Sequence, residues 1–574
     1  MRKRSFYCKV FTLLLLGITF VFSSCKDNDT TQMVPTITLD NADASYTVKI
    51  GKTLRISPKY QNIADAVYAW KIDGKVVSTD SALVYNATEL GEKYTTLQVM
   101  NDAGEAYAEM KITVVNKLIP TISLIIPDEG YTIVKGSDLA LSPTIDNADG
   151  TTYSWTVNGN EEATTQNYTF NTKTAGSYNV KLTATNEDGK DEVSVPVKVC
   201  NPEDMPFSWH FDQTVFNMST GRRIKLQAFD VTNAFDANFT WTVDGVEKQS
   251  SKSTSYIFDE TKEGSHKVVV TMKNAYAQNS QTLTVNVCKP EGTYQRAVTN
   301  SSSPLWNKVY EFLAAPGQFV NAGYTATTME QAIEYASNRL KQVSYVSLGA
   351  YGGYIVLGFD HSVVNDGNYN LEFFGNSFKG SSEPGIVWVM QDENGNGLPD
   401  DTWYELKGSA YDEGLEVQNY WVTYYKPKAP GMSVQWKDNL GGSGSIDYLM
   451  FHQQDYYYPN WVTTDSYVLR GSKLAPRTRE VSPGYWSNDE FEWGYVDNFS
   501  PIDRLTDDIN YGAAANGNHM KISNAITFEG KPANLKYVDF VKVQTGLQTK
   551  AGWLGENSTE VFNVKDFNLV KNNK

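Results

Sequence analysis

Apolar and polar residues alternate with a period of two along most of this chain. Three segments show the pattern best, and each carries an aromatic residue, a tryptophan two positions later and then an Asp-Gly or Asn-Gly pair. The tryptophans are Trp70, Trp155 and Trp241, which lie 85 and 86 residues apart. Period-two patterns indicate half-buried strands, and the Asp-Gly or Asn-Gly pair indicates a tight hairpin turn. Each repeat is therefore predicted to be a small β-sandwich with its tryptophan in the core.

The three repeats divide the first half of the chain into modules of similar length. In each repeat a later alternating strand ends in asparagine, at Asn101, Asn186 and Asn274. The modules resemble PKD-like or immunoglobulin-like domains. Modules of this kind mostly act as spacers, so the resemblance implies a spacer role. It indicates the fold better than the function, because a fold does not by itself specify a function. The predicted modules span residues 35–117, 118–200 and 201–289.

The composition changes at about residue 290, and residues 290–574 are predicted to form one large domain. Nine of the thirteen tryptophans lie beyond residue 300. A helix is predicted from the caps Thr327 and Thr328 to Leu340, and strand patterns surround it. The predicted fold class is all-β: three tandem Ig/PKD-like β-sandwich modules followed by a large jelly-roll-like β-sandwich domain with long aromatic loops and one or two short helices.

The first residues carry targeting signals. A basic start precedes an apolar run, 10–22, that is too short to span a bilayer comfortably. The run ends in Phe-Ser-Ser-Cys, which resembles a bacterial lipobox and implies that Cys25 is lipidated. Segment 1–25 is then a lipoprotein signal peptide and 26–34 a polar tether. An ordinary secretory signal, cut elsewhere, is the alternative.

Net charge and the lengths of the apolar runs limit the partners and the cellular location expected for the protein. The formal net charge of −16 argues against a nucleic-acid partner, because binding nucleic acid needs a basic face. No later apolar run approaches the length of a membrane span, so the lipid is predicted to be the only membrane attachment. This predicts an outer-membrane protein at the cell surface.

Cys200 and Cys288 end equivalent strands of successive modules. If the third module is a sandwich, the two residues lie at its opposite poles. A strand of six residues spans roughly 20 Å, whereas a disulfide needs Cα atoms closer than about 7 Å. The two cysteines are therefore predicted to be unpaired.

One loop of the large domain is dense in oxygen ligands. Segment 392–401 has Asp, Asn, Asn and Asp at positions 1, 3, 5 and 9 of an EF-hand-type spacing, with glycine at position 6. Position 12 is tryptophan rather than glutamate, so a bidentate ligand must come from a neighbouring acidic residue. A structural Ca²⁺ is predicted here, and a polar turn without metal is the alternative. The predicted ligands are Asp392, Asn394, Asn396, Asp400, Asp401 and Glu405.

The sequence contains no familiar catalytic motif. It has neither H-E-x-x-H nor G-x-S-x-G, and its five histidines are scattered without ligand spacing. Carboxylate pairs for glycosidase chemistry remain an alternative, because they converge only in space, about 5–9 Å apart. The balance favours a binding protein over an enzyme.

Two stretches of the large domain combine clustered rings with amides and carboxylates. They are 451–461 (FHQQDYYYPNW) and 485–495 (YWSNDEFEWGY). Rings supply face contacts for a flat ligand, and polar groups fix its orientation. For any single ring, packing in the core is the alternative. The predicted ligand-binding residues are Tyr456, Tyr457, Tyr458, Trp461, Trp486, Trp493 and Tyr495.

Several segments together resemble Bacteroidetes cell-surface lipoproteins of vitamin B12 uptake loci, of the BtuH-type cobalamin-binding family. They are APGQFVN (315–321), SLGAYGGYIVLGFDHSV (347–363), EPGIVWVMQDENGNGLPDDTWYEL (383–406) and VDFVKVQTG…GWLGENSTEV (538–561). The resemblance implies non-catalytic capture of a corrinoid outside the cell, with cobalamin as ligand rather than cofactor. It also implies transfer to a TonB-dependent outer-membrane transporter.

Two other functions fit the same features. A carbohydrate-binding surface lipoprotein of a glycan-utilisation system would use the same anchor, spacers and aromatic loops. A jelly-roll polysaccharide hydrolase or lyase is the second alternative. The SLGAYGGYIVLGF and EPG segments also occur in jelly-roll surface proteins of unknown ligand, so the motifs indicate the domain better than the ligand.

Overall fold

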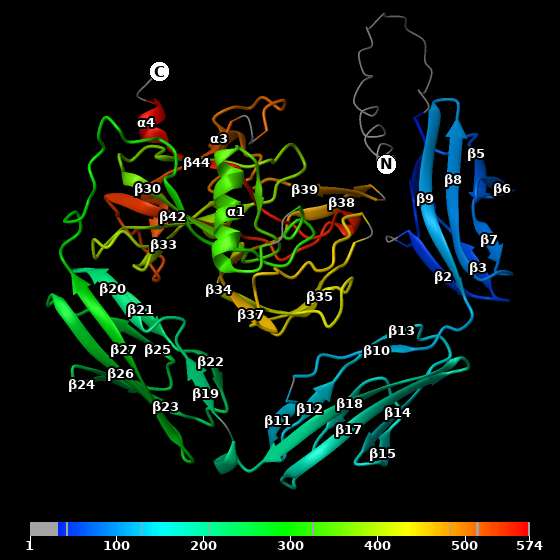
Figure 1. Ribbon diagram of the computed structural model, residues 1–574, viewed down its shortest axis with the longest axis horizontal. Coiled ribbons are helices and arrows are strands. Elements are labelled where there is room, and N and C mark those ends of the chain that lie inside the picture. The colour runs from blue at the N-terminus through cyan, green and yellow to red at the C-terminus, as the bar shows by residue number, and fades with distance from the viewer. Residues whose placement is uncertain are drawn as a thin grey trace, which may run out of the picture.

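The computed structural model describes residues 33–41, 44–127, 129–205, 207–323, 326–449, 451–482, 484–512 and 516–571. The predicted signal peptide with Cys25, and most of the tether, lie outside the described residues. The predicted fold class is confirmed: three β-sandwich modules precede a larger β-sandwich domain with few, short helices. In Figure 1 the modules form an arc, coloured from blue to green, that leads to the larger domain.

Each module is built on a five-stranded sheet with the same strand order. The first strand of each order runs parallel to the second, and the other neighbours are antiparallel. Module 1 has β2 (Ser45–Lys49), β9 (Gly104–Val115), β8 (Gly91–Asn101), β5 (Val67–Ile72) and β6 (Lys75–Ser78). Module 2 has β11 (Tyr131–Val134), β18 (Gly189–Cys200), β17 (Gly176–Asn186), β14 (Thr152–Val157) and β15 (Asn160–Ala163). Module 3 has β20 (Val215–Ser219), β27 (Gln278–Cys288), β26 (Gly264–Lys273), β23 (Asn238–Val243) and β24 (Val246–Ser251).

Two short antiparallel pairs accompany the main sheet of every module. In module 1 they are β1 (Thr36–Thr38) with β4 (Lys59–Gln61), and β3 (Thr53–Ile56) with β7 (Leu83–Asn86). In module 2 they are β10 (Thr121–Ser123) with β13 (Thr144–Asp146), and β12 (Leu139–Leu141) with β16 (Tyr168–Phe170). In module 3 they are β19 (Ser208–His210) with β22 (Phe229–Thr232), and β21 (Ile224–Gln227) with β25 (Ser255–Phe258).

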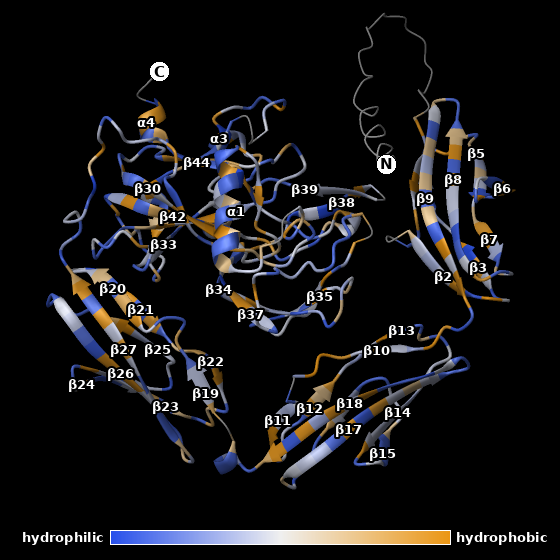
Figure 2. Ribbon diagram, viewed as in Figure 1, coloured by the Kyte–Doolittle hydropathy of each residue, from blue (hydrophilic) through white to orange (hydrophobic). Residues whose placement is uncertain are grey.

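The repeated sequence motif builds the core and one hairpin of each module. Trp70, Trp155 and Trp241 are fully buried, as predicted. Asp73 and Asn158 have φ angles of 47° and 49°, and the glycine after each also has a positive φ. Two successive positive φ angles define a type I′ turn, which suits the twist of a two-stranded hairpin. Figure 2 shows the matching alternation of apolar and polar residues along the module strands.

The repeated asparagine closes the turn of a second hairpin. Asn101 Oδ1 accepts hydrogen bonds from the backbone N–H groups of Ala103 and Gly104, and its amide donates to the carbonyl of Met33. Asn186 and Asn274 make the corresponding turn contacts in modules 2 and 3. The asparagine therefore satisfies backbone groups that the turn leaves without strand partners.

The larger domain contains three principal sheets. The six-stranded sheet is antiparallel throughout, in the order β28 (Lys308–Leu313), β30 (Tyr354–Val364), β42 (Tyr537–Thr545), β32 (Gly385–Met390), β33 (Trp403–Leu406) and β41 (Ala525–Ile526). The four-stranded sheet has β36 (Ser443–Ile446), β35 (Val434–Asp438), β34 (Glu416–Tyr425) and β37 (Ser466–Leu474). The third sheet has β40 (Asn518–Met520), β31 (Leu371–Phe374) and β44 (Asn563–Asp566). Two short pairs are β29 (Val346–Ser347) with β43 (Glu560–Val561), and β38 (Thr478–Ser482) with β39 (Tyr485–Asn488).

The predicted helix forms as α1 (Met329–Lys341). Thr328 caps it, because its side chain accepts a hydrogen bond from the Gln331 N–H at 3.3 Å. The buried face of α1, with Ala336 and Leu340, belongs to the same core cluster as β28 and the six-stranded sheet. The other α-helices are α2 (Ser409–Asp412), α3 (Pro501–Arg504) and α4 (Phe567–Lys571). No helix in the described part of the chain is both long enough and apolar enough to cross a membrane.

Module 3 contacts the larger domain through charged and aromatic side chains. Arg470 of β37 forms ion pairs with Asp212 at 2.9 Å and with Asp230 at 3.0 Å, and its guanidinium lies over the ring of Phe229. Arg223 pairs with Glu529 at 3.1 Å. These contacts fix the last module against the domain that it precedes. The two module cysteines, Cys200 and Cys288, are both free thiols.

Candidate functional site

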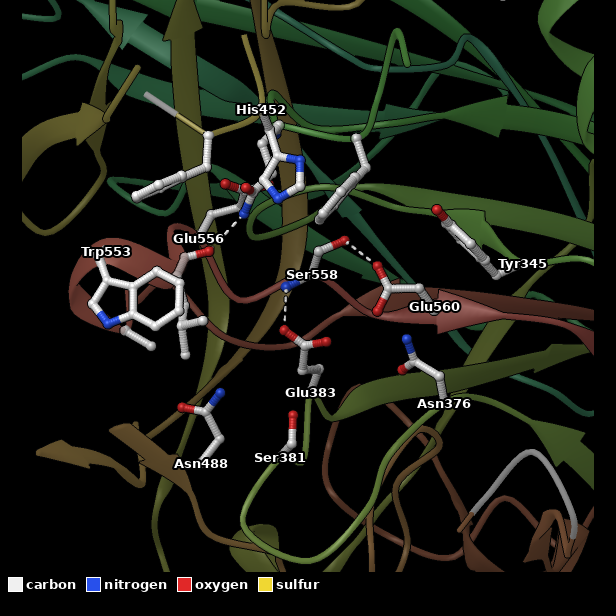
Figure 3. Close-up of a pocket in the computed structure, with 15 residues that line it drawn as sticks. Tyr345, Asn376, Ser381, Glu383, His452, Asn488, Trp553, Glu556, Ser558 and Glu560 are labelled. Atoms are coloured by element: carbon white, nitrogen blue, oxygen red, sulfur yellow. Dashed lines mark hydrogen bonds between the residues drawn. The ribbon is translucent and has the colours of Figure 1, made fainter. Parts of the chain in front are cut away.

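A cavity of about 330 Å³ opens in the larger domain, and segments that are far apart in the sequence line it. Its wall includes Glu383 just before β32, Asn488 at the end of β39 and Glu560 in β43. Trp553, in the 3-10 helix Gly552–Leu554, also lines the cavity and lies on the left of the view in Figure 3, with Glu560 on the right. Because polar groups converge here on a concave surface, the cavity is the candidate binding site.

Close backbone approach brings acidic residues together at this cavity. Gly385 and Val496 exchange two backbone hydrogen bonds, of 3.0 and 3.1 Å. A Cβ atom on Gly385 would lie 2.8 Å from side-chain atoms of Val496 and Thr559, so glycine alone permits the contact. The contact places Glu383 beside Asp497, whose carbonyl accepts the Glu383 backbone N–H at 3.0 Å.

Backbone donors hold the carboxylate of Asp497. Its Oδ1 accepts from the N–H groups of Asn376 and Ser377, at 2.7 and 2.8 Å, and its Oδ2 accepts from the Glu560 N–H at 2.9 Å. A Cβ atom on Gly375 would lie 2.3 Å from Oδ1, so a glycine is needed at this position as well. Asp497 itself has a φ of 52°, in the left-handed region, and backbone strain of this kind is frequent at functional sites.

Ser558 contacts two more carboxylates, as Figure 3 shows. Its backbone N–H donates to Glu383 Oε1 at 3.3 Å, and its hydroxyl donates to Glu560 Oε1 at 3.0 Å. A fourth carboxylate, Glu556, accepts the Gln318 N–H through Oε1 at 2.7 Å. The other oxygen of Glu556, Oε2, is buried and has no hydrogen-bond partner.

The four carboxyls share an acidic and water-poor environment. Burial raises the pKa of Asp497 to about 8, and the charge of Glu383 adds to the effect. Burial also raises the pKa of Glu556 to about 8, again with a contribution from Glu383. The pKa values of Glu383 and Glu560 are raised by burial too, and Glu560 lies close enough to Glu383 and Asp497 to feel both charges. Like charges at such separations cannot all ionise without an external cation.

Exposed rings flank the acidic wall. Phe451 is 63 % exposed and Trp553 44 % exposed, and their ring centroids lie 6.0 Å apart in an edge-to-face arrangement. The Trp553 indole N–H donates to the Gly484 carbonyl at 2.8 Å, which fixes the ring. The His452 ring lies against Phe319, with centroids 4.6 Å apart. The cavity therefore combines aromatic faces with carboxylate and amide acceptors.

Four of the seven rings predicted to bind ligand are buried in the core, where they pack against protein atoms. Tyr457, Tyr458, Trp461 and Tyr495 are each at most 5 % exposed, so protein atoms cover the ring faces. The Tyr457 hydroxyl, for example, accepts the Leu449 N–H and donates to a backbone carbonyl, both at 3.1 Å. Tyr456, Trp486 and Trp493 are half-buried, and none of the seven lines the cavity.

The two predicted loops nevertheless reach the cavity through other residues. Loop 451–461 contributes Phe451 and His452, and loop 485–495 contributes Asn488. The side-chain oxygen of Asn488 is buried and has no hydrogen-bond partner. Both predicted loops therefore border the cavity, but through side chains other than the seven predicted rings, and ligand binding by those rings stays a prediction.

The predicted calcium loop folds as a turn around Asp392. The Asp392 carboxylate accepts from the three backbone N–H groups of residues 395–397, at 2.7, 3.1 and 2.9 Å. The amides of Asn394 and Asn396 donate to the Asp400 carboxylate, at 3.1 and 2.9 Å. These oxygens accept hydrogen bonds from within the loop, and Ca²⁺ at this position stays a prediction.

The two residues expected to complete that ligand set each accept a hydrogen bond within the protein. Asp401 Oδ2 accepts the Glu393 backbone N–H at 2.9 Å, whereas Asp401 Oδ1 is buried and has no hydrogen-bond partner. Glu405, on β33, accepts a hydrogen bond from the Ser472 hydroxyl on β37 at 2.5 Å. The loop also joins the domain to module 3, because the Asn217 amide donates to the Asp400 carbonyl at 3.1 Å. The loop therefore helps to hold module 3 against the larger domain.

Sequence reasoning did not select the polar residues of the cavity, although a signal for them was present. Three of the segments that carry the family resemblance meet at the cavity: 315–321 through Gln318, 383–406 through Glu383, and 538–561 through Trp553, Glu556 and Glu560. Their shared presence in one wall is a reason to read those segments as a site rather than as scaffold.

Comparison with known proteins identifies the modules. A family model described as a PKD-like domain matches residues 34–101 and 119–186, in modules 1 and 2. Module 3 has the same sheet order but lies outside these matches. Domains of this kind are typical of extracellular or surface proteins, so the modules indicate a binding or surface protein. No curated protein matches the sequence.

Solved structures similar to parts of the chain are themselves arrays of small β-sandwiches. They include fibronectin(III)-like modules of Clostridium thermocellum CbhA, at 16 % identity, covering 30 % of this chain and 100 % of that chain with a TM-score of 0.18. Extracellular domains 3–5 of Drosophila OTK match at 11 % identity, covering 44 % and 97 %, with a TM-score of 0.18. The four N-terminal Ig domains of Dscam1 match at 13 % identity, covering 45 % and 78 %, with a TM-score of 0.22. Scores this low support no functional inference.

Proposed function

We propose that this protein is a surface-displayed binding protein whose larger domain captures a polar small molecule in the carboxylate-lined cavity. The observation that carries the proposal is the pairing of exposed rings with buried acceptors that have no protein partner, Asn488 Oδ1 and Glu556 Oε2. Buried polar atoms without partners are costly, and a ligand that donates hydrogen bonds would satisfy them. The three modules then serve as spacers that hold this domain away from the membrane.

A corrinoid is the first ligand to test, because the sequence resemblance favours it and its edge is rich in amide donors. The cavity, at about 330 Å³, lies at the lower end of the range for small-molecule pockets. It would therefore receive an amide-bearing edge of the macrocycle, with Phe451 and Trp553 against the remainder. Transfer to a TonB-dependent outer-membrane transporter belongs to this proposal.

Carbohydrate is the second candidate, and the position of Trp553 favours it. A partly exposed indole beside carboxylates and amides offers a flat apolar face together with acceptors for hydroxyl groups. Glycan cleavage is the enzymatic form of this candidate.

Binding measurements on the full protein test these proposals. Cyanocobalamin is titrated and followed by visible absorbance and calorimetry, and a glycan array covers the second candidate, with turnover assayed on every glycan that binds. Trp553→Ala is expected to weaken binding at least tenfold without lowering stability, since the ring is partly exposed. Tyr94→Ala, an exposed ring of module 1, is the matched control. Binding that is unchanged in Trp553→Ala, or absent for both ligand classes, overturns the assignment.

The membrane attachment is a separate part of the proposal and rests on the sequence. Lipidation at Cys25 would anchor the protein to the outer membrane, and the polar tether could not replace the lipid. Cys25→Ala is therefore expected to release the protein from the membrane fraction. A variant that still fractionates with membranes and labels at the cell surface contradicts the anchor.

A further inference from the structure

Three carboxylates converge at the wall of the cavity. One oxygen each from Glu383, Asp497 and Glu560 can be chosen so that all three lie within 4.8 Å of one another. Ca²⁺ binds oxygen ligands at about 2.3–2.6 Å, so two ligands on opposite sides of the ion are about 5 Å apart. The three oxygens therefore fit around a single ion.

Two further buried oxygens in the same cavity point independently to a missing ligand. Asn488 is 8 % exposed and Glu556 is 7 % exposed, and both line the cavity together with Glu383 and Glu560. Asn488 Oδ1 and Glu556 Oε2 have no hydrogen-bond partner. Two buried acceptors in the same cavity as an acidic cluster are explained if a cation, with its bound water or ligand, occupies that cavity.

The Asn376 amide is a further neutral donor to the cluster. Its terminal atom facing Asp497 lies 3.2 and 3.3 Å from the two carboxylate oxygens, and nitrogen in that position donates to the carboxylate. The amide carries no charge, so it leaves the negative charge of the cluster uncompensated.

The protein offers the cluster hydrogen-bond donors but no positive charge. The donors are backbone N–H groups and the Ser558 hydroxyl. Among the described residues, no lysine, arginine or histidine forms an ion pair with Glu383, Asp497, Glu556 or Glu560. Buried carboxylates are ordinarily paired or coordinate a metal, so an internal salt bridge does not account for this cluster.

We propose that Glu383, Asp497 and Glu560 form a binding site for a hard divalent cation, Ca²⁺ in the first instance, in the wall of the cavity. This site is distinct from loop 392–401. Because Glu383 and Glu560 line the cavity, a bound ion would have positions open for water or for oxygen atoms of a ligand. The cation site stands without the proposed capture function, since titration with metal alone measures it.

The test uses the full protein, stripped with EDTA and titrated with CaCl₂ by calorimetry. A second readout is Tb³⁺ luminescence excited through tryptophan, because Trp553 lines the same cavity. The wild type is expected to bind an ion that Glu383→Gln with Glu560→Gln binds at least tenfold more weakly. Asp392→Asn with Asp400→Asn, the matched pair in the loop, is expected to retain that ion.

The titrations distinguish a cation site at the cavity from one in loop 392–401. Any of three results overturns the proposal. The first is loss of the ion in the loop double variant alone, the second is unchanged affinity in the cavity double variant, and the third is no uptake of Ca²⁺ by the wild type. Far-UV circular dichroism checks that each variant is folded. If the cavity pair does not fold, the single variant Asp497→Asn is titrated in its place, and binding equal to wild type is again contrary to the proposal. Failure to bind corrinoid or glycan while Ca²⁺ is bound would count against the capture function alone.

Discussion

The loop 392–401 and the carboxylate cluster at the cavity are both acidic regions of one domain, but they are assembled differently. In the loop, the Asp392 carboxylate accepts three backbone N–H groups from the residues that directly follow it. In the cluster, Glu383, Asp497 and Glu560 come from distant segments and face one another. Asp497 also accepts three backbone N–H groups, but from distant segments. The difference lies in the convergence of three carboxylates, which needs a proton, a cation or a ligand to offset their repulsion.

Asp392→Ala should have the largest effect on stability. It leaves three backbone N–H groups in the loop without their carboxylate, so we expect the free energy of unfolding of the larger domain to fall by about 3 kcal/mol in chelator. Urea titration followed by tryptophan fluorescence measures it. Asp400→Ala is the control, because Asp400 is exposed and accepts only from side-chain amides of the loop. Equal stability of Asp392→Ala and wild type would show that the loop is not held in this way.

Added Ca²⁺ should act on the cluster instead. An ion that binds only the folded state stabilises it by about 2.7 kcal/mol when its concentration is 100 times the dissociation constant. We expect this gain in the wild type and in Asp400→Ala, and its loss in Glu383→Gln with Glu560→Gln. Thermal unfolding with and without Ca²⁺ is the measurement. If the gain disappeared in Asp400→Ala and persisted in the cavity variant, the roles of the two regions would be exchanged.

Asp503 gives a buried carboxyl outside both regions for comparison. Burial raises its pKa to about 7, although it accepts the Gly494 N–H at 2.7 Å. The folded state then holds a proton that the unfolded chain releases near pH 4, so the stabilisation is complete below pH 4 and is lost as the pH rises to 7. Asp503→Asn should remove this dependence, on the order of 1 kcal/mol per pH unit at most. Parallel stability profiles of variant and wild type from pH 5 to pH 8 would contradict the assignment.

Tyr457→Phe should have the smallest effect and should separate packing from binding. It removes one buried hydroxyl that links Leu449 and His452, so we expect a loss of about 1 kcal/mol in stability. Binding of ligand is expected to stay within twofold of wild type, because the ring does not line the cavity. Calorimetric titration beside a urea titration checks both. A tenfold loss of affinity at normal stability would show that Tyr457 takes part in ligand binding.

Local patterns predicted most of the fold. The Trp and Asp-Gly or Asn-Gly spacing determined the modules, because the tryptophan core and the hairpin turn are built by residues close in sequence. Helix α1 followed from its cap at Thr328 and its apolar face. The arrangement of sheets in the larger domain could not be predicted in the same way, because its strand order joins β30 to β42 and β32 to β42 across long sequence separations.

Most residues of the candidate site could not be predicted from the sequence. Glu383, Asp497 and Glu560 carry no common spacing, and backbone hydrogen bonds between segments 383–385 and 496–497 bring the first two together. Clustered rings such as Tyr457 and Tyr458 suggested a binding face, but large aromatic side chains are also what a domain with long loops needs for its core. Only the three-dimensional arrangement distinguishes these two uses.

Anomalous diffraction from crystals of the full protein soaked in MnCl₂ tests the central comparison most directly, since Mn²⁺ accepts the same oxygen ligands as Ca²⁺ and is visible by its anomalous signal. It examines both acidic regions in one experiment. We predict the strongest anomalous peak between Glu383, Asp497 and Glu560. A peak confined to loop 392–401, or no peak at the cluster, would contradict the account.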